Sequence, residues 1–279
     1  MPGPDWFQGQ TAVVTGAAHG IGRATAGLLA SLGARVVAVD ADRSALEESF
    51  SDGACLRCSG DLASGDVSRL ANDIHERYGP AQLIVNNVGI STPGSFLELG
   101  EEDFDRVFAT NLRGPWFFTK RLVEHLVSAR RGGAIVFVSS LHDSTVFGYP
   151  AYSASKAAIA MLVKELAAEL APLGIRVNAV SPGAIRTASS PMPGPDEARL
   201  GRLVPLGRVG EPIDVARMIA VLLSDGWSGY VTGANVRVDG GLALHSWMSS
   251  NPSGEELDGP GDGLLSRVRR GFSSPRPGG

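Results

Sequence analysis

The chain turns through a glycine-rich segment directly after its first β-prone run, and this break limits the folds that it can adopt. The run Thr11–Thr15 is rich in β-branched residues, and a helical pattern covers residues 23–32. Between them lie Gly16, Ala17, Ala18, His19, Gly20, Ile21 and Gly22. Glycines let a backbone turn tightly and approach a ligand, and the start of a helix attracts negative charge. The segment predicts strand, loop and helix around a dinucleotide, with Gly16, His19, Gly20, Ile21 and Gly22 in contact with it.

An acidic residue follows at a distance typical of such a site. Residues 34–39 form a second apolar β-prone run, and Asp40, eighteen residues after Gly22, ends it. A carboxylate there can accept hydrogen bonds from the 2′-hydroxyl of an adenosine ribose but would repel a 2′-phosphate. We therefore expect NAD rather than NADP as the cofactor, although Arg43 nearby weakens this preference slightly.

Tyr152 and Lys156 stand four residues apart at the head of a helical pattern that runs to Leu170. Residues at this spacing lie one turn apart on the same helix face. A free tyrosine has a pKa of about 10, and a neighbouring ammonium lowers it toward the range needed for proton transfer near neutrality. The pair predicts a general acid and base. An isolated Tyr-x-x-x-Lys is common by chance, however, and more often lies on an ordinary exposed helix face.

Together, the glycine spacing Thr-Gly-x-x-x-Gly-x-Gly and the downstream Tyr-x-x-x-Lys resemble the short-chain dehydrogenase/reductase family, over residues 10–244. The resemblance implies a Rossmann-like α/β fold and hydride transfer between NAD(H) and a secondary alcohol or ketone. In that family's mechanism Tyr152 is the general base or acid. Lys156 lowers the pKa of that tyrosine and binds the nicotinamide ribose.

Two further family motifs follow in order along the chain. Asp61 and Leu62 close the third strand pattern, where the family places an acidic residue against the adenine amino group. The next apolar run ends at residues 86–89, Asn-Asn-Val-Gly, which resemble the family's Asn-Asn-Ala-Gly signature. The resemblance therefore implies that Asn87 and Gly89 lie at the cofactor.

Two more motifs lie closer to the reacting atoms. Asn111 resembles the helical asparagine with which the family holds a water in its proton relay. Residues 181–187 match the family's Pro-Gly-x-x-x-Thr segment. That match implies that Ile185 and Thr187 contact the nicotinamide carboxamide.

The serine that holds the substrate has two candidates, because Ser139 and Ser140 are adjacent after the strand pattern 134–138. The family usually places this serine thirteen residues before the tyrosine, which indicates Ser139. The strand register, counted from the paired glycines before the strand, indicates Ser140. We choose Ser140, since a slip in strand register is costly and a one-residue deletion in the following loop is not. His142 and Asp143 in that loop are expected to be exposed polar residues rather than substrate contacts.

The apolar runs at 36–39, 83–85 and 135–138 show no polar alternation, as in a parallel sheet that is covered on both faces. Strand and helix patterns alternate without a linker until residue 248. This favours one doubly wound α/β domain over residues 1–248, with helices on both faces. Residues 249–279 are rich in Gly, Pro and Ser and mixed in charge, and we expect them to be disordered.

Composition argues against several classes of function. The net charge of the 279 residues is −4, with no basic stripe, so nucleic acid is not an expected partner. No apolar stretch approaches the roughly 18 residues of a membrane span, and the first residues lack the order of a signal peptide. We expect a cytoplasmic protein without a membrane partner. Cys55 and Cys58 fall in the third strand pattern on opposite faces, which argues against a disulfide or a metal site.

The sequence therefore indicates an NAD-dependent alcohol dehydrogenase or ketone reductase. The alternatives are an NADPH-dependent ketoreductase in a biosynthetic pathway and a non-catalytic NAD-binding redox sensor, which would not need the catalytic residues. The substrate is expected to be mainly apolar, because aromatic and aliphatic residues are present in the loops near the site: Phe96, Val146, Phe147, Tyr149 and Met192. Residues 188–205 resemble a lid. The family also implies a homo-oligomer, a tetramer or a dimer, packed through the helices that carry Asn111 and Tyr152.

Overall fold

The computed structural model of the protein describes residues 6–187 and 194–244. Within these residues seven parallel strands form one sheet, in the order β3-β2-β1-β4-β5-β6-β7. The strands are β1 Thr11–Thr15, β2 Arg35–Asp40, β3 Leu56–Ser59, β4 Leu83–Asn86, β5 Gly133–Val138, β6 Ile175–Pro182 and β7 Asn235–Val238. The predicted doubly wound α/β fold in a single domain is confirmed.

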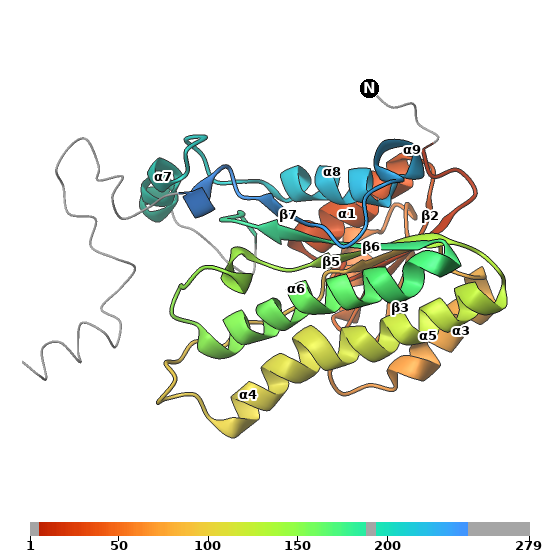
Figure 1. Cartoon of the computed structure of the whole chain (residues 1–279), viewed down its shortest axis with the longest axis horizontal. Helices are drawn as coiled ribbons and strands as arrows, with labels where there is room; N and C mark the ends of the chain where they lie inside the picture. The colour runs from red at the N-terminus through yellow and green to blue at the C-terminus, as the bar shows by residue number, and fades with distance from the viewer. Residues whose placement is uncertain (1–5, 188–193, 245–279) are drawn as a thin grey trace, which may run out of the picture.

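Helices cover both faces of the sheet, with α1 and α8 on the face drawn uppermost and α3, α5 and α6 on the other (Figure 1). The helices of these two layers are α1 Gly20–Ser31, α3 Val67–Tyr78, α5 Gly114–Ser128, α6 Pro150–Leu170 and α8 Pro212–Leu223. Four shorter helices are α2 Arg43–Ser49, α4 Glu101–Phe108, α7 Gly194–Leu203 and α9 Asp225–Ser228. A π-helical turn, Ala109–Arg113, joins α4 to α5, and 3₁₀ turns lie at Leu141–Asp143, Ala171–Leu173 and Leu242–Leu244.

Successive residues of the central strands pack alternately into the two helical layers. Val13 lies in the apolar cluster under α3, α5 and α6, whereas Val14 lies in the cluster under α1 and α8. Every residue of β1 and β4 is buried, because helices cover both faces there. In the edge strands β3 and β7, by contrast, exposed and partly buried residues alternate. Two-sided burial explains why the central strands read as continuous apolar runs.

The winding of the chain reverses between β1 and β4, which are neighbours in the sheet. From β1 the chain continues to β2 and β3 on one side, and from β4 it continues to β5, β6 and β7 on the other. The loops that leave the carboxyl ends of β1 and β4 therefore run to opposite faces and leave a crevice between them. The glycine loop, residues 16–22, follows β1, and residues 87–89 follow β4. The motifs found in the sequence thus meet at this edge of the sheet.

Some element boundaries differ from the prediction. α1 begins at Gly20, because the last part of the glycine loop already forms its first turn. β3 ends at Ser59, so Asp61 and Leu62 follow the strand rather than closing it. Cys55 precedes β3 and packs on the α1 side of the sheet, and Cys58 packs on the other side; both are free thiols. Burial raises the pKa of the Cys55 thiol to about 12.

None of the described helices combines the length and the hydropathy needed to cross a bilayer. The segment predicted to be disordered, residues 249–279, lies outside the described residues. The same is true of Met192 and of the first residues of the predicted lid.

Candidate active site

The glycine loop packs so closely that side chains are excluded from it. A Cβ atom on Gly22 would lie 2.0 Å from the carbonyl oxygen of Gly16, so the first turn of α1 can follow β1 this closely only without one. Gly20 lies against Thr187, whose Cγ2 would be 3.1 Å from an added Cβ. His19 precedes α1 as its N-cap residue and is exposed. The positive end of the α1 dipole therefore opens onto this loop, as a pyrophosphate site requires.

Asn87 fixes the glycine loop from the other side of the crevice. Its side-chain Nδ2 donates to the carbonyl oxygens of Thr15 and Gly16, at 3.1 and 3.0 Å. Its backbone N–H donates to the hydroxyl of Thr15 at 3.0 Å. The amide that the sequence predicted at the cofactor thus holds the loop that would bind it.

Asp40 ends β2 with a carboxylate held in place by backbone groups. It accepts hydrogen bonds from the N–H groups of Ala18, at 2.9 Å, and of Asp42, at 3.0 Å. Each carboxylate oxygen has further lone pairs for a ligand hydroxyl. The guanidinium of Arg43 is paired with Glu47 at 2.8 Å, and both side chains are largely exposed. Asp40 is therefore a fixed anion at the end of β2, and Arg43, three residues further on, is paired with another carboxylate.

Asp61 and Leu62 stand in the turn after β3. The Asp61 carboxylate accepts from the backbone N–H of Ala63 and from the hydroxyl of Ser64, and the Ser64 hydrogen bond holds the pKa of this carboxyl below its usual value. Asp61 itself is exposed, whereas Leu62 is buried. A Cβ on Gly114 would lie 2.1 Å from the Leu62 carbonyl oxygen, so the start of α5 fixes this turn.

Asn111 lies in the π-helical turn between α4 and α5 and is completely buried. Its Oδ1 accepts from the backbone N–H of Ile90 at 2.8 Å, and its Nδ2 donates to the Ile90 carbonyl at 2.9 Å. Nδ2 also donates to the hydroxyl of Ser155 on α6 at 3.0 Å. The side chain therefore ties together the segment after β4, the π-helical turn and the helix of Tyr152.

Lys156 is buried, and its ammonium points back to the sheet. Its Nζ donates to the carbonyl oxygen of Val138, the last residue of β5, at 2.9 Å, and lies 5.6 Å from the centre of the Tyr152 ring. Burial lowers the pKa of Lys156 to about 8, and the carboxylate of Asp143 opposes this shift. Gly89 borders the ammonium, since an added Cβ there would lie 3.2 Å from Nζ.

Tyr152 lies in the first turn of α6 and is partly exposed. Burial raises the pKa of its phenol above the usual value, and a hydrogen bond with Ser140 lowers it in part. The sequence predicted a lowered pKa under the influence of Lys156. In the structure the pKa of Tyr152 is raised instead, because burial of the phenol raises the pKa more than the hydrogen bond with Ser140 lowers it.

The two adjacent serines point in different directions. Ser140 is the hydrogen-bond partner of Tyr152, and its hydroxyl also accepts from the backbone N–H of His142. Ser139 instead donates toward Asp143 and the backbone carbonyl of Lys156, each at 3.2 Å. The backbone stays extended beyond the end of β5, where consecutive side chains face opposite sides, so only one of the two serines can reach the phenol.

The expectation that His142 and Asp143 are exposed loop residues is wrong. The imidazole of His142 packs edge-on against Tyr152, with ring centroids 4.9 Å apart and planes at 77°. Asp143 Oδ2 accepts from Ser181 at 2.5 Å and from Asn235 at 2.7 Å, which joins the end of β6 and the start of β7 to the loop after β5. This loop has no periodic pattern in the sequence, so only its position directly after Ser140 could have indicated these two residues.

Ile185 and Thr187 lie in the segment that leaves β6. Ile185 is buried, and its backbone bridges to Gly210. Thr187 borders a pocket of about 810 Å³ that extends along α1 from Gly20 and Arg23. The glycine loop and the segment predicted to hold the nicotinamide carboxamide therefore share one cavity.

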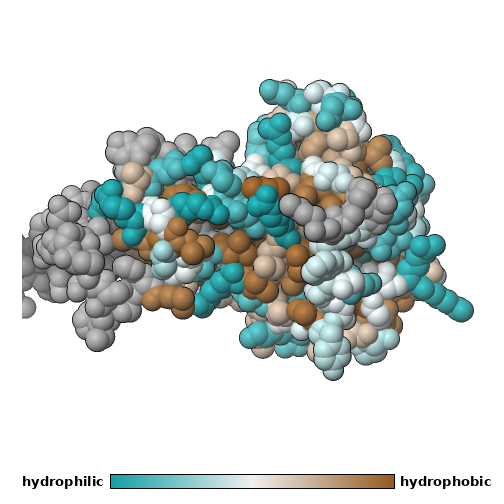
Figure 2. Space-filling model, turned by 90° about the horizontal axis from the view of Figure 1, so that it is seen from above, coloured by the Kyte–Doolittle hydropathy of each residue, from teal (hydrophilic) through white to brown (hydrophobic). Residues whose placement is uncertain are grey.

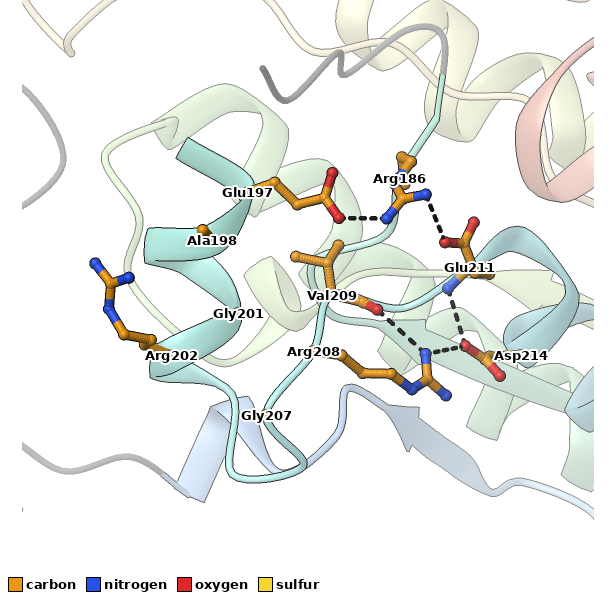
Figure 3. Close-up of a pocket in the computed structure, with 10 residues that line it drawn as sticks. All are labelled: Arg186, Glu197, Ala198, Gly201, Arg202, Gly207, Arg208, Val209, Glu211 and Asp214. Carbon is orange, nitrogen blue, oxygen red and sulfur yellow. Dashed lines mark hydrogen bonds and ion pairs between the residues drawn. The ribbon is translucent and has the colours of Figure 1, made fainter. Parts of the chain in front are cut away.

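Arg186 connects the helix α7 to the body of the domain (Figure 3). Its guanidinium is paired with Glu197 of α7 and, at 3.0 Å, with Glu211, the residue before α8. The hydrogen bond with Glu197 raises the pKa of Arg186. These residues line a pocket of about 610 Å³ that also includes Arg208 and Asp214, which are paired at 2.7 Å. This charged pocket lies beside the predicted nicotinamide segment. The ion pairs of Arg186 link α7 to the rest of the domain.

Large apolar side chains are exposed in the loops expected to bind the substrate. Phe96 and Val146 are 83% and 94% exposed, and Tyr149 is 39% exposed. Phe147 packs on the His142 ring, with centroids 4.5 Å apart. Among the described residues, no group of three or more His, Cys, Asp or Glu side chains is arranged to hold a metal ion.

Comparison with known proteins adds an independent finding. A sequence model of the family described as "Enoyl-(Acyl carrier protein) reductase" matches residues 16–243. The chain is 37% identical over 249 residues to the 3-oxoacyl-[acyl-carrier-protein] reductase FabG of Thermotoga maritima, with 85% of this chain and 99% of that protein covered. It is also 37% identical over 249 residues to the (3R)-3-hydroxyacyl-CoA dehydrogenase of Mus musculus, with 84% and 96% covered. A solved structure named short chain dehydrogenase/reductase family protein superposes with a TM-score of 0.76 at 32% identity, over 85% of this chain and 99% of that one.

Proposed function

We propose a reaction for this chain, which belongs to the short-chain dehydrogenase/reductase family of oxidoreductases: the transfer of a hydride between NAD(H) and a secondary alcohol or ketone. The observation that carries the proposal is the grouping of Ser140, Tyr152 and Lys156 at the carboxyl edge of the sheet. A hydroxyl and a phenol in contact, with an ammonium nearby, can hold an oxygen and move its proton. Lys156 borders Gly89, beside the crevice that the glycine loop enters.

NAD is the proposed cofactor, and the residues present fit it. The cradle at Gly16 and Gly22 admits no side chain, which suits a pyrophosphate. Asp40 offers ribose hydroxyls an acceptor and opposes a 2′-phosphate, and Arg43, the cation nearest in sequence, is paired with Glu47. When bound, NAD supplies a hydride acceptor at the nicotinamide C4.

Tyr152 is the proposed general base in oxidation and general acid in reduction. Ser140 donates a hydrogen bond to the substrate oxygen, and Tyr152 takes the hydroxyl proton or returns it. The Lys156 ammonium, 5.6 Å from the ring centre, favours the phenolate and so opposes the effect of burial. The three groups would thus act on one oxygen while the crevice orients the carbon beside it.

The proton would continue from Tyr152 through Lys156 to a water held near Asn111. The side-chain amide of Asn111 is engaged with Ile90 and Ser155, which leaves its backbone to hold that water. A π-helical turn loosens the backbone hydrogen-bond ladder, so a carbonyl in this turn is suited to the role.

For the substrate we propose only a broad chemical class. Exposed apolar residues around the site suit a small and mainly apolar alcohol or ketone. The relatives named a 3-oxoacyl-[acyl-carrier-protein] reductase and a (3R)-3-hydroxyacyl-CoA dehydrogenase support a second candidate, a ketoreductase of a biosynthetic pathway that uses NADPH. A non-catalytic redox sensor would not require the contact between Ser140 and Tyr152.

A homo-oligomer in the cytoplasm is part of the proposal. On α6, Ala154, Ala157 and Met161 are exposed, and Trp116 and Phe117 are exposed on α5. Apolar residues on two neighbouring helices suit isologous packing against a second copy. Further hydrophobic patches interrupt the hydrophilic surface on the side of α7, α8 and α9 (Figure 2). A second interface there would make a tetramer.

Titration of the protein with NADH and NADPH, followed by turnover on a panel of secondary alcohols and ketones, tests this proposal. Tighter binding of NADH and oxidation of apolar secondary alcohols would support it. Preference for NADPH with reduction of 3-oxoacyl thioesters would favour the second candidate. Binding without any turnover would support the redox sensor.

A further inference from the structure

His142 is placed by its neighbours at the reacting hydroxyls, yet the proposed mechanism gives it no task. It lies in the 3₁₀ turn that follows Ser140, and its backbone N–H donates to the Ser140 hydroxyl at 3.3 Å. Its ring stands edge-on against the Tyr152 ring, with centroids 4.9 Å apart. His142 thus contacts both groups that would hold the substrate oxygen, Ser140 through its backbone N–H and Tyr152 through its imidazole.

The orientation of the ring is fixed on several sides. Phe147 and Tyr149 pack against it, with centroids 4.5 and 5.8 Å away. Its Nδ1 is 3.2 Å from the hydroxyl of Ser153 on α6. A histidine held by one hydrogen bond and three aromatic rings presents its other nitrogen in a defined direction.

That other nitrogen is available to a ligand. In the part of the chain that the structure describes, Nε2 makes no hydrogen bond, and it is not one of the atoms that are both buried and unpartnered. It is therefore not fully buried and can be reached by a ligand. Burial and the positive charge of Lys156 lower the pKa of His142, and Asp143 opposes them only in part. The imidazole is accordingly uncharged near pH 7, and its Nε2 can act either as a hydrogen-bond donor or as an acceptor.

We propose that His142 is a specificity-determining residue whose Nε2 binds a second oxygen of the substrate, a hydroxyl or carbonyl on the carbon next to the reacting carbon. With the ring centroids 4.9 Å apart, one small substrate can reach both Tyr152 and Nε2, and two oxygens on neighbouring carbons are the shortest pair that would do so. The inference rests on the proposed function, because it assigns the reacting oxygen to Tyr152 and Ser140. It narrows the substrate to an apolar body with a vicinal diol, a hydroxyketone or a diketone.

Two matched alcohols test the inference: cyclohexanol and vicinal cyclohexanediol, each with saturating NAD. The measured quantity is the ratio of kcat/KM for the diol to that for the monoalcohol. His142→Phe keeps a ring but removes Nε2, and the ratio should fall about 2- to 10-fold, the range that one neutral hydrogen bond supports. His142→Gln returns a polar group at similar reach and should restore part of the ratio. His125→Phe, which alters a histidine stacked on His75 between α3 and α5, should leave the ratio unchanged.

A binding measurement on the unaltered protein guards against a variant that does not fold. In the complex with NADH, the ¹⁵N resonance of His142 Nε2 should shift when the diol is added and not when cyclohexanol is added. An equal ratio in all variants, or no shift of this resonance, overturns the role of His142 and leaves the proposed function intact. A protein that oxidises neither alcohol, nor reduces the matching ketones with either nucleotide, overturns the proposed function and this inference with it.

Discussion

The Nζ of Lys156 lies 5.6 Å from the centre of the Tyr152 ring while it donates a 2.9 Å hydrogen bond to the carbonyl of Val138. The ammonium is therefore fixed between the end of β5 and an aromatic face. Burial lowers its pKa to about 8. The charge that would stabilise a phenolate is thus held in place, and it titrates close to the pH range in which the enzyme would work.

Asp143→Asn should move the alkaline limit of activity to lower pH. Turnover that needs the Lys156 ammonium is lost as pH rises through the pKa of about 8, and the Asp143 carboxylate raises that pKa. Removing its charge lowers the pKa of Lys156, so kcat should begin to fall earlier on the alkaline side. The measurement is kcat against pH with saturating cofactor. Asp225→Asn, which removes the exposed carboxylate that pairs with the mostly buried Arg176, serves as the control, and identical profiles for all three proteins would refute the assignment.

Ser140→Ala should lower kcat far more than Ser139→Ala. Ser140 touches Tyr152, and loss of a hydrogen-bond donor to a reacting oxygen typically costs roughly 10²-fold in kcat. Ser139 bonds Asp143 and the Lys156 carbonyl, so its replacement should lower the free energy of unfolding by about 1 kcal/mol and spare most turnover. Steady-state kinetics and thermal unfolding of both variants decide between them. The opposite ranking in kcat would show that Ser139 holds the substrate.

Asp40→Ala should weaken the preference for NAD over NADP. The variant loses acceptors for the ribose hydroxyls and also loses repulsion of a 2′-phosphate. The difference in binding free energy between NADH and NADPH should shrink by roughly 1 to 3 kcal/mol, the scale of charge-assisted hydrogen bonds. Fluorescence titration of both nucleotides measures it. An unaltered protein that already binds NADPH more tightly would contradict the role given to Asp40.

Met161→Glu should weaken the proposed contact between copies. Met161 is 56% exposed on α6, beside exposed Ala157, and a carboxylate there would be buried without a partner in an isologous interface. Light scattering should show a smaller assembly than for the unaltered protein. Ser68→Glu on α3 adds the same single negative charge on another exposed face and should not change the mass. A monomeric unaltered protein would show that the exposed residues serve another purpose.

Much of the fold could be predicted because its signals are local. Val36 to Val39 and Ile135 to Val138 read as buried strands, since parallel strands covered on both faces are continuously apolar. The glycine loop could be predicted because its close packing excludes side chains: a Cβ at Gly22 would collide with the carbonyl oxygen of Gly16. The parallel sheet and the helices on both of its faces then followed from the alternation of the two patterns, whereas the strand order is known from the structure.

The surroundings of the site could not be read in the same way. His142 and Asp143 occupy a loop without periodicity, and their contacts with Tyr152, Ser181 and Asn235 join segments far apart in the chain. The pKa of Tyr152 depends on how deeply its phenol is buried, and the four-residue spacing to Lys156 does not predict that burial. The ion pairs of Arg186 likewise depend on where α7 packs.

The central claim is that Tyr152 moves the substrate proton, and Tyr152→Phe tests it most directly. The variant keeps the ring that packs on His142 and removes only the oxygen. With NAD⁺ bound to the same extent in both proteins, turnover of a secondary alcohol that the unaltered protein oxidises should fall by about 10²- to 10⁴-fold, the contribution of a general acid or base. Turnover within a few-fold of the unaltered protein, at equal occupancy by the nucleotide, would contradict the mechanism.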